Sequence, residues 1–253
     1  MSFPTRIYGK PGWEKQTYTA AKGRKLGTIM ELPDGRLFRF AFSGEAIATS
    51  GNLLMQKDIS NASHDTDLVV TAAVALGGTT VALTNAGAPV TKDQFADGYL
   101  YINDAAAEGQ MYIVKANGAA TTTGAISVTL DEEDGIQGTA LTTSSEVGLR
   151  ENLYKDVEIW DANDIDGIPV GWNVTPVGDN EYFWCQVHGV VAALFDSDDN
   201  AVLGRSVIPS PSVDGAVRSY DAAATTTVIN QIVGHAMVAS VDTERTLVFA
   251  TIE

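Results

Sequence analysis

The sequence predicts an all-β protein of compact antiparallel β-barrel or sandwich modules, with an extended N-terminal arm and an inserted small β domain. Short runs rich in β-branched and aromatic residues recur along the chain, and Gly, Pro, Asn and Asp separate them at intervals of about ten residues. No stretch has the periodicity of an amphipathic helix. The 253 residues are enough to bury a sizeable core without covalent staples.

Changes in composition divide the chain into four parts. Residues 1–27 are predicted to form a basic, extended arm, and residues 28–67 a hairpin region that packs with the C-terminal β domain. Residues 68–150, rich in Thr, Ala and Gly, are predicted to form the inserted β domain. Residues 151–253 then complete the C-terminal β domain.

The first hairpin follows the arm. Leu26–Leu32 and Arg36–Phe42 flank Pro33-Asp34-Gly35, in which proline presets φ and glycine tolerates a positive φ. Glu45–Gln56 is expected to be a loop with a short strand, and Lys57–Asp67 a polar linker.

The inserted domain is predicted from a series of short strands divided by turn residues. The expected strands read LVVTAAVAL, TTVALT, DGYLYIND, GQMYIVKA, AISVTL and EVGLR. The acidic run Asp131–Asp134 is expected to be a solvated hairpin tip.

The stretch Gly178–Phe195, which reads GDNEYFWCQVHGVVAALF, is expected to be a central hairpin of two strands. Strand alternation gives it apolar side chains on both faces, so it needs cover on both sides. One face carries Tyr182, Trp184, Gln186 and His188, and the other Phe183, Cys185 and Val187. A closing hairpin of Val233–Val241 and Thr246–Ile252 is predicted to supply part of that cover.

The net charge of −16 is distributed unevenly. Residues 1–60 hold nine Lys and Arg against five Asp and Glu, which is +4, whereas the rest holds seven against 27, which is −20. An acidic body of this kind repels phosphate backbones, so no nucleic-acid partner is expected.

The basic arm also carries aromatic residues, which are unusual in a purely solvated tail. We therefore expect it to order on a partner, with its aromatic side chains as anchors and its basic side chains steering the encounter. The predicted binding residues are Phe3, Arg6, Tyr8, Lys10, Trp13, Lys15, Tyr18, Lys22, Arg24 and Lys25.

Candidate metal and catalytic residues form no convincing pattern. Asp161, Asn163 and Asp166-Gly167, like Asp196, Asp198 and Asn200, resemble parts of a calcium loop but lack its full ligand spacing. His64, His188 and His235 are too far apart in sequence for a zinc motif, and His188 is expected to be a half-buried strand histidine. We expect no metal, no cofactor and no catalytic residues, although abundant carboxylates leave a glycosidase open.

The single cysteine and the hydropathy pattern bear on disulfides and on membrane segments. Cys185 excludes an intramolecular disulfide and is expected to be a buried small hydrophobe. With no export signal and no apolar run of about 18 residues, a soluble protein is expected, with no membrane partner.

Four segments, spread over most of the chain, read LGTIMELPDGRLFRFAFSGEAIATSGNLLMQ, GYLYINDAAAEGQMYIVKA, GIPVGWNVTPVGDNEYFWCQVHG and VGHAMVASVDTERTLVFATI. Together they resemble the capsid decoration (cement) proteins of tailed bacteriophages. The resemblance implies a non-enzymatic structural protein on the outer surface of the virion capsid, assembled in the host cytoplasm. It also implies a homotrimer that binds and stabilises the major capsid protein shell. A tail-fibre or receptor-binding adaptor and a virion polysaccharide-degrading enzyme are the alternatives.

Overall fold

The computed structural model describes residues 6–56, 62–85, 87–162, 167–196, 200–220, 231–239 and 244–253. These residues are organised almost entirely as β-strands, which confirms the all-β prediction. The helical elements among them are single turns: η1 (Trp13–Lys15), α1 (Ala62–Asp65) and η2 (Glu132–Asp134).

The chain folds into two compact units. Residues 59–152 form one unit, here called the small unit, for which the sequence suggested 68–150. The rest of the described chain forms the large unit, in which the segment before residue 59 packs with the segment after residue 152.

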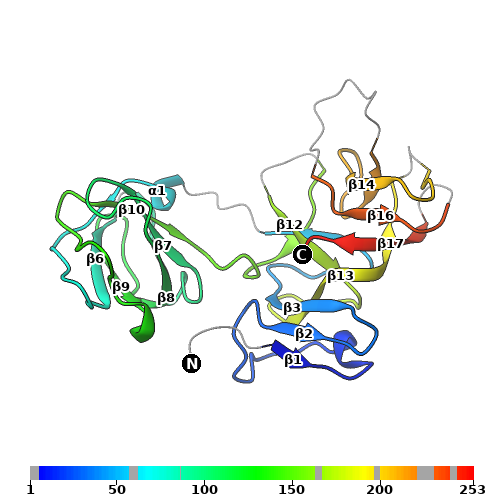
Figure 1. The fold of residues 1–253 in the computed structure, drawn as a ribbon, viewed down its shortest axis with the longest axis horizontal. Helices are drawn as coiled ribbons and strands as arrows, with labels where there is room; N and C mark the ends of the chain where they lie inside the picture. The colour runs from blue at the N-terminus through cyan, green and yellow to red at the C-terminus, as the bar shows by residue number, and fades with distance from the viewer. Residues whose placement is uncertain are drawn as a thin grey trace. The chain divides into compact units, whose positions relative to one another are not determined.

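The large unit is built on one sheet whose main path runs β1-β2-β3-β13-β17-β16-β14-β15 (Figure 1). Strands β4, β11 and β12 branch from this path, since β12 pairs with both β13 and β4. The strand bounds are β1 (Arg6–Tyr8), β2 (Ile29–Glu31), β3 (Leu37–Phe42), β4 (Leu53–Met55), β11 (Glu158–Ile159), β12 (Pro169–Asn173), β13 (Tyr182–Leu194), β14 (Ser206–Pro209), β15 (Val217–Ser219), β16 (Gly234–Ala236) and β17 (Arg245–Thr251).

The predicted first hairpin is confirmed. Strands β2 and β3 pair antiparallel, with Met30 opposite Phe38, and Gly35 in the turn adopts a φ of 84°. The turn closes through the Gly35 N–H, which donates to the Leu32 carbonyl. Local turn chemistry was therefore sufficient to predict this element.

The predicted central hairpin is wrong, because Tyr182–Leu194 is one continuous strand of 13 residues. Gly189, with a φ of +88°, lies beside a shift of register between Gln186 and His188, so the chain bends instead of turning back. The strand changes partner at this bend. Its first half pairs with β3 and its second half, from His188, pairs with β17.

Three apolar clusters lie along β13, as expected for a strand covered on both faces. Trp184 packs with Phe38 and Phe40, whereas Phe183 and Cys185 belong to a second cluster on the other face. Beyond the bend, a third cluster contains Val191, Ala193 and Phe195, together with other large-unit side chains such as Trp160 and Trp172. Cys185 is free and buried, as predicted, and burial raises the pKa of its thiol.

The closing hairpin appears as β16 and β17, which pair antiparallel with His235 opposite Phe249. The first of the two strands is shorter than predicted, and residues 240–243 of the connecting turn lie outside the described residues. Inward-facing Val248 and Ala250 of β17 enter the third cluster.

The small unit is a six-stranded sheet in the order β5-β10-β7-β8-β9-β6, nearly closed as a barrel by a bridge between Val70 and Leu83. Five of its strands match the predicted series, whereas the first predicted strand, residues 68–76, is a strand only over Leu68–Val69. The inward side chains form a single cluster that includes Leu100, Val128 and Leu130. The strand bounds are β5 (Leu68–Val69), β6 (Thr80–Thr84), β7 (Tyr99–Asp104), β8 (Met111–Asn117), β9 (Ala125–Leu130) and β10 (Glu146–Arg150).

The acidic run Asp131–Asp134 is not simply a solvated tip. Asp131 is buried and caps η2 by accepting a hydrogen bond from the Glu133 N–H. Asp134 accepts a hydrogen bond of 2.8 Å from the Ile113 N–H. Two of these carboxylates therefore satisfy backbone donors, which a count of charges does not reveal.

Candidate functional site

The N-terminal segment from Arg6 onward lies on the protein's own sheet. Strand β1 pairs in parallel with β2, and Ile7 packs against the cluster around Phe40 and Trp184. The Arg6 guanidinium lies 3.0 Å from the Glu31 carboxylate. The expectation that this segment orders only on a partner is corrected by these contacts. Phe3 lies outside the described residues.

Tyr18, Lys22 and Arg24 are held by intramolecular contacts. The Tyr18 N–H and C=O both bond to the backbone of Tyr182, and the Arg24 guanidinium lies 5.0 Å from the Tyr18 ring centroid. Arg24 also lies 5.5 Å from the Phe40 ring, and Lys22 lies 4.9 Å from Tyr18. These cation–π contacts fix part of the predicted binding set to the body, and Lys25 lies close by, partly buried.

The remaining predicted residues are exposed on β1, on the segment that follows it and on η1. Tyr8 is 77% exposed and Trp13 is 37% exposed. We call this surface the N-terminal edge, and it consists of Arg6, Tyr8, Lys10, Trp13 and Lys15. It combines basic and aromatic groups on a chain that is otherwise strongly acidic.

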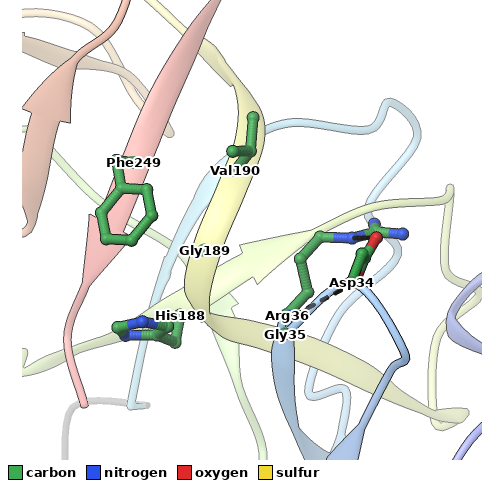
Figure 2. Close-up of a pocket in the computed structure, with 7 residues that line it drawn as sticks. All are labelled: Asp34, Gly35, Arg36, His188, Gly189, Val190 and Phe249. Atoms are coloured by element: carbon green, nitrogen blue, oxygen red, sulfur yellow. Dashed lines mark hydrogen bonds and ion pairs between the residues drawn. The ribbon is translucent and has the colours of Figure 1, made fainter.

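A hollow of about 530 Å³ lies where the turn between β2 and β3 meets the bend of β13 (Figure 2). It is lined by Asp34, Gly35, Arg36, His188, Gly189, Val190 and Phe249. The His188 and Phe249 rings meet edge to face, 5.2 Å between centroids. The His188 Nδ1 lies 2.7 Å from the Glu253 carbonyl oxygen, which can only accept, so Nδ1 carries the proton.

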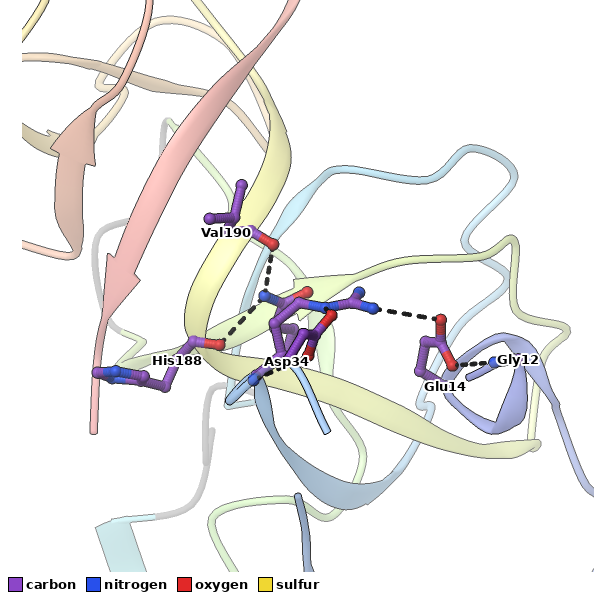
Figure 3. A network of polar contacts seen from close by, with 7 residues as sticks. Gly12, Glu14, Asp34, His188 and Val190 are labelled. Atoms are coloured by element: carbon purple, nitrogen blue, oxygen red, sulfur yellow. Dashed lines mark hydrogen bonds and ion pairs between the residues drawn. The ribbon is translucent and has the colours of Figure 1, made fainter. Parts of the chain in front are cut away.

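A chain of polar contacts begins at one wall of the hollow and leads to η1 (Figure 3). The Arg36 Nε donates to the Asp34 carboxylate at 2.8 Å, and its Nη2 lies 3.6 Å from the Glu14 carboxylate. Glu14 is buried and also accepts a hydrogen bond of 2.6 Å from the Gly12 N–H. The turn and η1 are thereby fixed to each other.

Opposing effects act on the carboxyl of Asp34. Partial burial raises its pKa, but hydrogen bonds from the side chain and backbone of Arg36, together with the Arg36 charge, outweigh burial and leave the pKa lowered. Asp34 is therefore ionised at neutral pH and holds the guanidinium in place.

The side-chain amide of Gln186 bonds to two backbone carbonyls of the bend in β13, and we call this contact the Gln186 clamp. Its Nε2 donates to the carbonyl oxygens of His188 at 3.1 Å and Val190 at 2.9 Å. Figure 3 draws both bonds as dashed lines that start at these two carbonyl oxygens. These bonds fix the orientation of the amide. The buried Oε1 has no hydrogen-bond partner within the part of the chain that the structure describes. Gln186 also lines a smaller hollow of about 170 Å³, together with Arg36 and Val190.

The hollow brings together an imidazole, a guanidinium and a carboxylate, from His188, Arg36 and Asp34. Its lining contains no hydroxyl, thiol or amine, and the carboxylate of Asp34 is engaged by Arg36. Neither Glu14 nor Gln186 was singled out from sequence, since their roles depend on partners distant in the chain.

The candidate metal residues are dispersed or incompletely described. Asp196 accepts hydrogen bonds from the Ser210 and Ser212 hydroxyls, at 2.5 and 2.7 Å, and so supports a loop. Residues 163–166 and 197–199, which contain three of the other proposed ligands, Asn163, Asp166 and Asp198, lie outside the described residues. Within the described ranges, no group of three or more His, Cys, Asp or Glu is arranged to hold a metal ion.

The three histidines occupy different surroundings. His64 is buried, with its Nε2 3.2 Å from the Asn85 Oδ1. His188 is half-buried in β13, as predicted, and His235 is exposed on β16.

Comparisons with protein-family models, curated proteins and solved structures find no match. Among the described residues, no helix is long and apolar enough to cross a membrane.

Proposed function

We propose that this chain is a non-enzymatic structural protein of a tailed-phage virion, which binds the outer surface of the major capsid protein shell as a homotrimer and stabilises it. The observation that carries this proposal is the N-terminal edge. Tyr8 and Trp13 expose aromatic surface there, and Arg6, Lys10 and Lys15 are exposed basic residues of the same segment. Aromatic and basic side chains of this kind commonly anchor protein interfaces.

The backbone at this edge is also suited to binding. Strand β1 is the last strand on its side of the sheet, so its outer backbone groups are not paired within that sheet. An extended segment of a partner can add to such an edge through main-chain hydrogen bonds. The neighbouring side chains would then select the partner.

The charge distribution favours the outside of the shell. A protein with a net charge of −16 would meet dense phosphate inside a DNA-filled head and be repelled. The basic N-terminal edge can instead be steered to acidic groups on the shell surface, with an on-rate that falls as salt rises.

The test measures occupancy on decoration-free heads of the parent phage at low and high salt. Deletion of residues 1–27 is unsuitable, because Ile7, Tyr18 and Leu26 pack on the core cluster. Trp13→Ala should weaken binding by about 2 kcal/mol, roughly thirtyfold, if Trp13 is an interface anchor. Lys10→Glu with Lys15→Glu should slow association most at low salt.

Lys92→Glu in the small unit is the matched charge control, since its side chain is 79% exposed and lies outside the N-terminal edge. It should leave occupancy unchanged. Equal occupancy for every variant would contradict the assignment of this edge. Electron microscopy that places the protein at the tail tip would overturn the capsid proposal itself.

A further inference from the structure

Open hydrogen-bond acceptors lie on both sides of the hollow at the bend of β13. The proton on the His188 Nδ1 leaves Nε2 as an acceptor in the neutral ring, and no hydrogen bond to Nε2 forms within the described residues. The Asp34 carboxylate accepts from the Arg36 N–H and Nε and, with 54% of its side chain exposed, keeps further lone pairs open. Figure 2 shows His188 on one side of the bend and Asp34 on the other. A ligand matched to both groups brings O–H or N–H donors to two places.

Apolar groups complete the lining of the hollow. The Phe249 ring is 38% exposed and the Val190 side chain is 37% exposed. Gly189 has no side chain to fill the space, and the stem of Arg36 lies against it, with the Arg36 Cγ 3.0 Å from the position of an added Cβ. The negative face of an aromatic ring attracts C–H groups, whose hydrogens are weakly positive. The matched ligand therefore presents C–H groups as well as donors.

The charges in the lining balance each other. The Asp34 carboxylate is held 2.8 Å from the Arg36 Nε, so a cationic ligand finds no uncompensated carboxylate in the hollow. An anionic ligand approaches a chain with a net charge of −16, and the Glu14 carboxylate already lies near the Arg36 guanidinium. The charges therefore favour a neutral ligand.

The hollow is formed without a ligand. The Gln186 clamp fixes the carbonyls of His188 and Val190 on the two sides of Gly189, and the Arg36–Glu14 contact ties the turn between β2 and β3 to η1. Sites for small ligands are usually preformed and have volumes of about 300–1,000 Å³. The hollow, at about 530 Å³, falls in this range. Little ordering would be needed on binding, which lowers its entropic cost.

We propose that this hollow binds a neutral saccharide. A sugar ring carries O–H donors around its rim and C–H groups on its faces, so it can donate to the His188 Nε2 and the Asp34 carboxylate while it packs against Phe249. A purely apolar ligand would cover both acceptors without supplying donors, which costs free energy. The inference goes beyond the shell-binding proposal and does not depend on it, because the hollow and the N-terminal edge share no residue.

The test titrates the purified full chain with maltose, cellobiose, lactose and N,N′-diacetylchitobiose, and follows binding by calorimetry and NMR. At least one of these neutral disaccharides should bind in the millimolar range or below and shift the imidazole signals of His188. The matched uronic acid of that disaccharide, in which a carboxylate replaces one CH₂OH group, should bind more weakly.

Variants of one aromatic residue test the apolar wall. Phe249→Ala should weaken saccharide binding about tenfold or more, because the ring that packs on the C–H groups is lost. Phe249→Tyr keeps the ring and should bind as wild type does. Tyr99→Ala is the matched control, since Tyr99 is an aromatic side chain 37% exposed on the small unit, and it should leave binding unchanged. Thermal unfolding of each variant distinguishes loss of the site from loss of the fold.

Three results would overturn the inference. One is that none of the four disaccharides binds wild type at up to about 10 mM, and another is that a folded Phe249→Ala variant binds as tightly as wild type. The third is tighter binding of the uronic acid than of its neutral counterpart, which would show that the hollow prefers an anion. Decoration of heads is measured separately, so each of these results leaves the shell-binding proposal standing.

Discussion

The two sheets of this chain present different outward surfaces, although both are built mainly from antiparallel strands with alternating side chains. In the small unit the outward positions include Thr80, Lys115 and Ser127, and on β7 and β8 outward Tyr99 lies opposite Ile113 and Tyr101 opposite Met111. In the large unit the exposed apolar side chains of Val190, Leu247, Phe249 and Met237 adjoin one another over β13, β17 and the end of β16. Outward apolar side chains therefore adjoin over two strands in the small unit and over three in the large unit, although strand periodicity is the same in both.

The interiors differ as well. The small unit has one cluster, mostly of aliphatic side chains inside a nearly closed barrel. The large unit has three clusters that share the single strand β13. A substitution in β13 should therefore lower the stability of the whole large unit. The stability of the small unit should depend on substitutions in its own core.

The largest expected effect comes from the two cores. Trp184→Ala should destabilise the large unit by about 3–5 kcal/mol, because a fully buried aromatic side chain is lost from its contacts with Phe38 and Phe40. Leu130→Ala should destabilise the small unit by about 2–5 kcal/mol. Denaturant unfolding followed by tryptophan fluorescence separates them, since all four tryptophans belong to the large unit.

Leu130→Ala should leave the tryptophan transition in place while shifting the tyrosine or far-ultraviolet transition. If both variants shift every probe equally, the two units unfold as one, and the comparison between them fails.

A smaller effect is expected at two glycines with similar backbone angles. Gly189 has a φ of +88°, and an added Cβ would lie 3.0 Å from the Arg36 Cγ, whereas Gly109 has a φ of +83° with nothing within 4 Å. Gly109→Ala should cost about 1 kcal/mol from the backbone angle alone. Gly189→Ala should cost about 2 kcal/mol, because Arg36 must also move. Equal losses of stability in the two variants would show that the close approach of Arg36 to Gly189 adds nothing to the cost of the substitution.

The smallest effect concerns Cys185, in the large unit. Burial raises the pKa of its thiol, so the folded state keeps the proton above the thiol's ordinary pKa of about 8.5. The resulting stability is fully present below that value and is lost as pH rises through the folded-state pKa. The large unit should lose about 1 kcal/mol between pH 7 and about pH 9. Cys185→Ala should remove this part of the pH dependence, and an unchanged slope in that variant would assign it to another group.

Much of the fold could be predicted because its information is local. The turn at Pro33-Asp34-Gly35 and the strand series of the small unit follow from turn residues and alternation, and the structure agrees with the turn and with five of the six predicted strands. The central hairpin was wrong because a glycine between two apolar runs is compatible with a turn or with a bend. Pairing with β3 on one side and β17 on the other selects the bend.

The candidate site was predicted only in part. Basic and aromatic residues near the N-terminus were identifiable by type. In the structure, however, the Tyr18 backbone bonds to Tyr182 and the Arg24 guanidinium contacts the Phe40 ring, and the sequence does not reveal these contacts. The Glu14–Arg36 contact and the Gln186 clamp likewise join distant segments.

The sequence by itself determined the all-β class, most strand positions, the burial of Cys185 and the uneven charge, because each depends on residue type and short-range periodicity. The tertiary structure decided which strands pair, and therefore which outward side chains gather into a surface. Val190, Met237 and Leu247 are ordinary exposed residues in their own strands. Only the pairing of β13, β17 and β16 makes them one apolar face without carboxylates, because a surface is a property of neighbours in space.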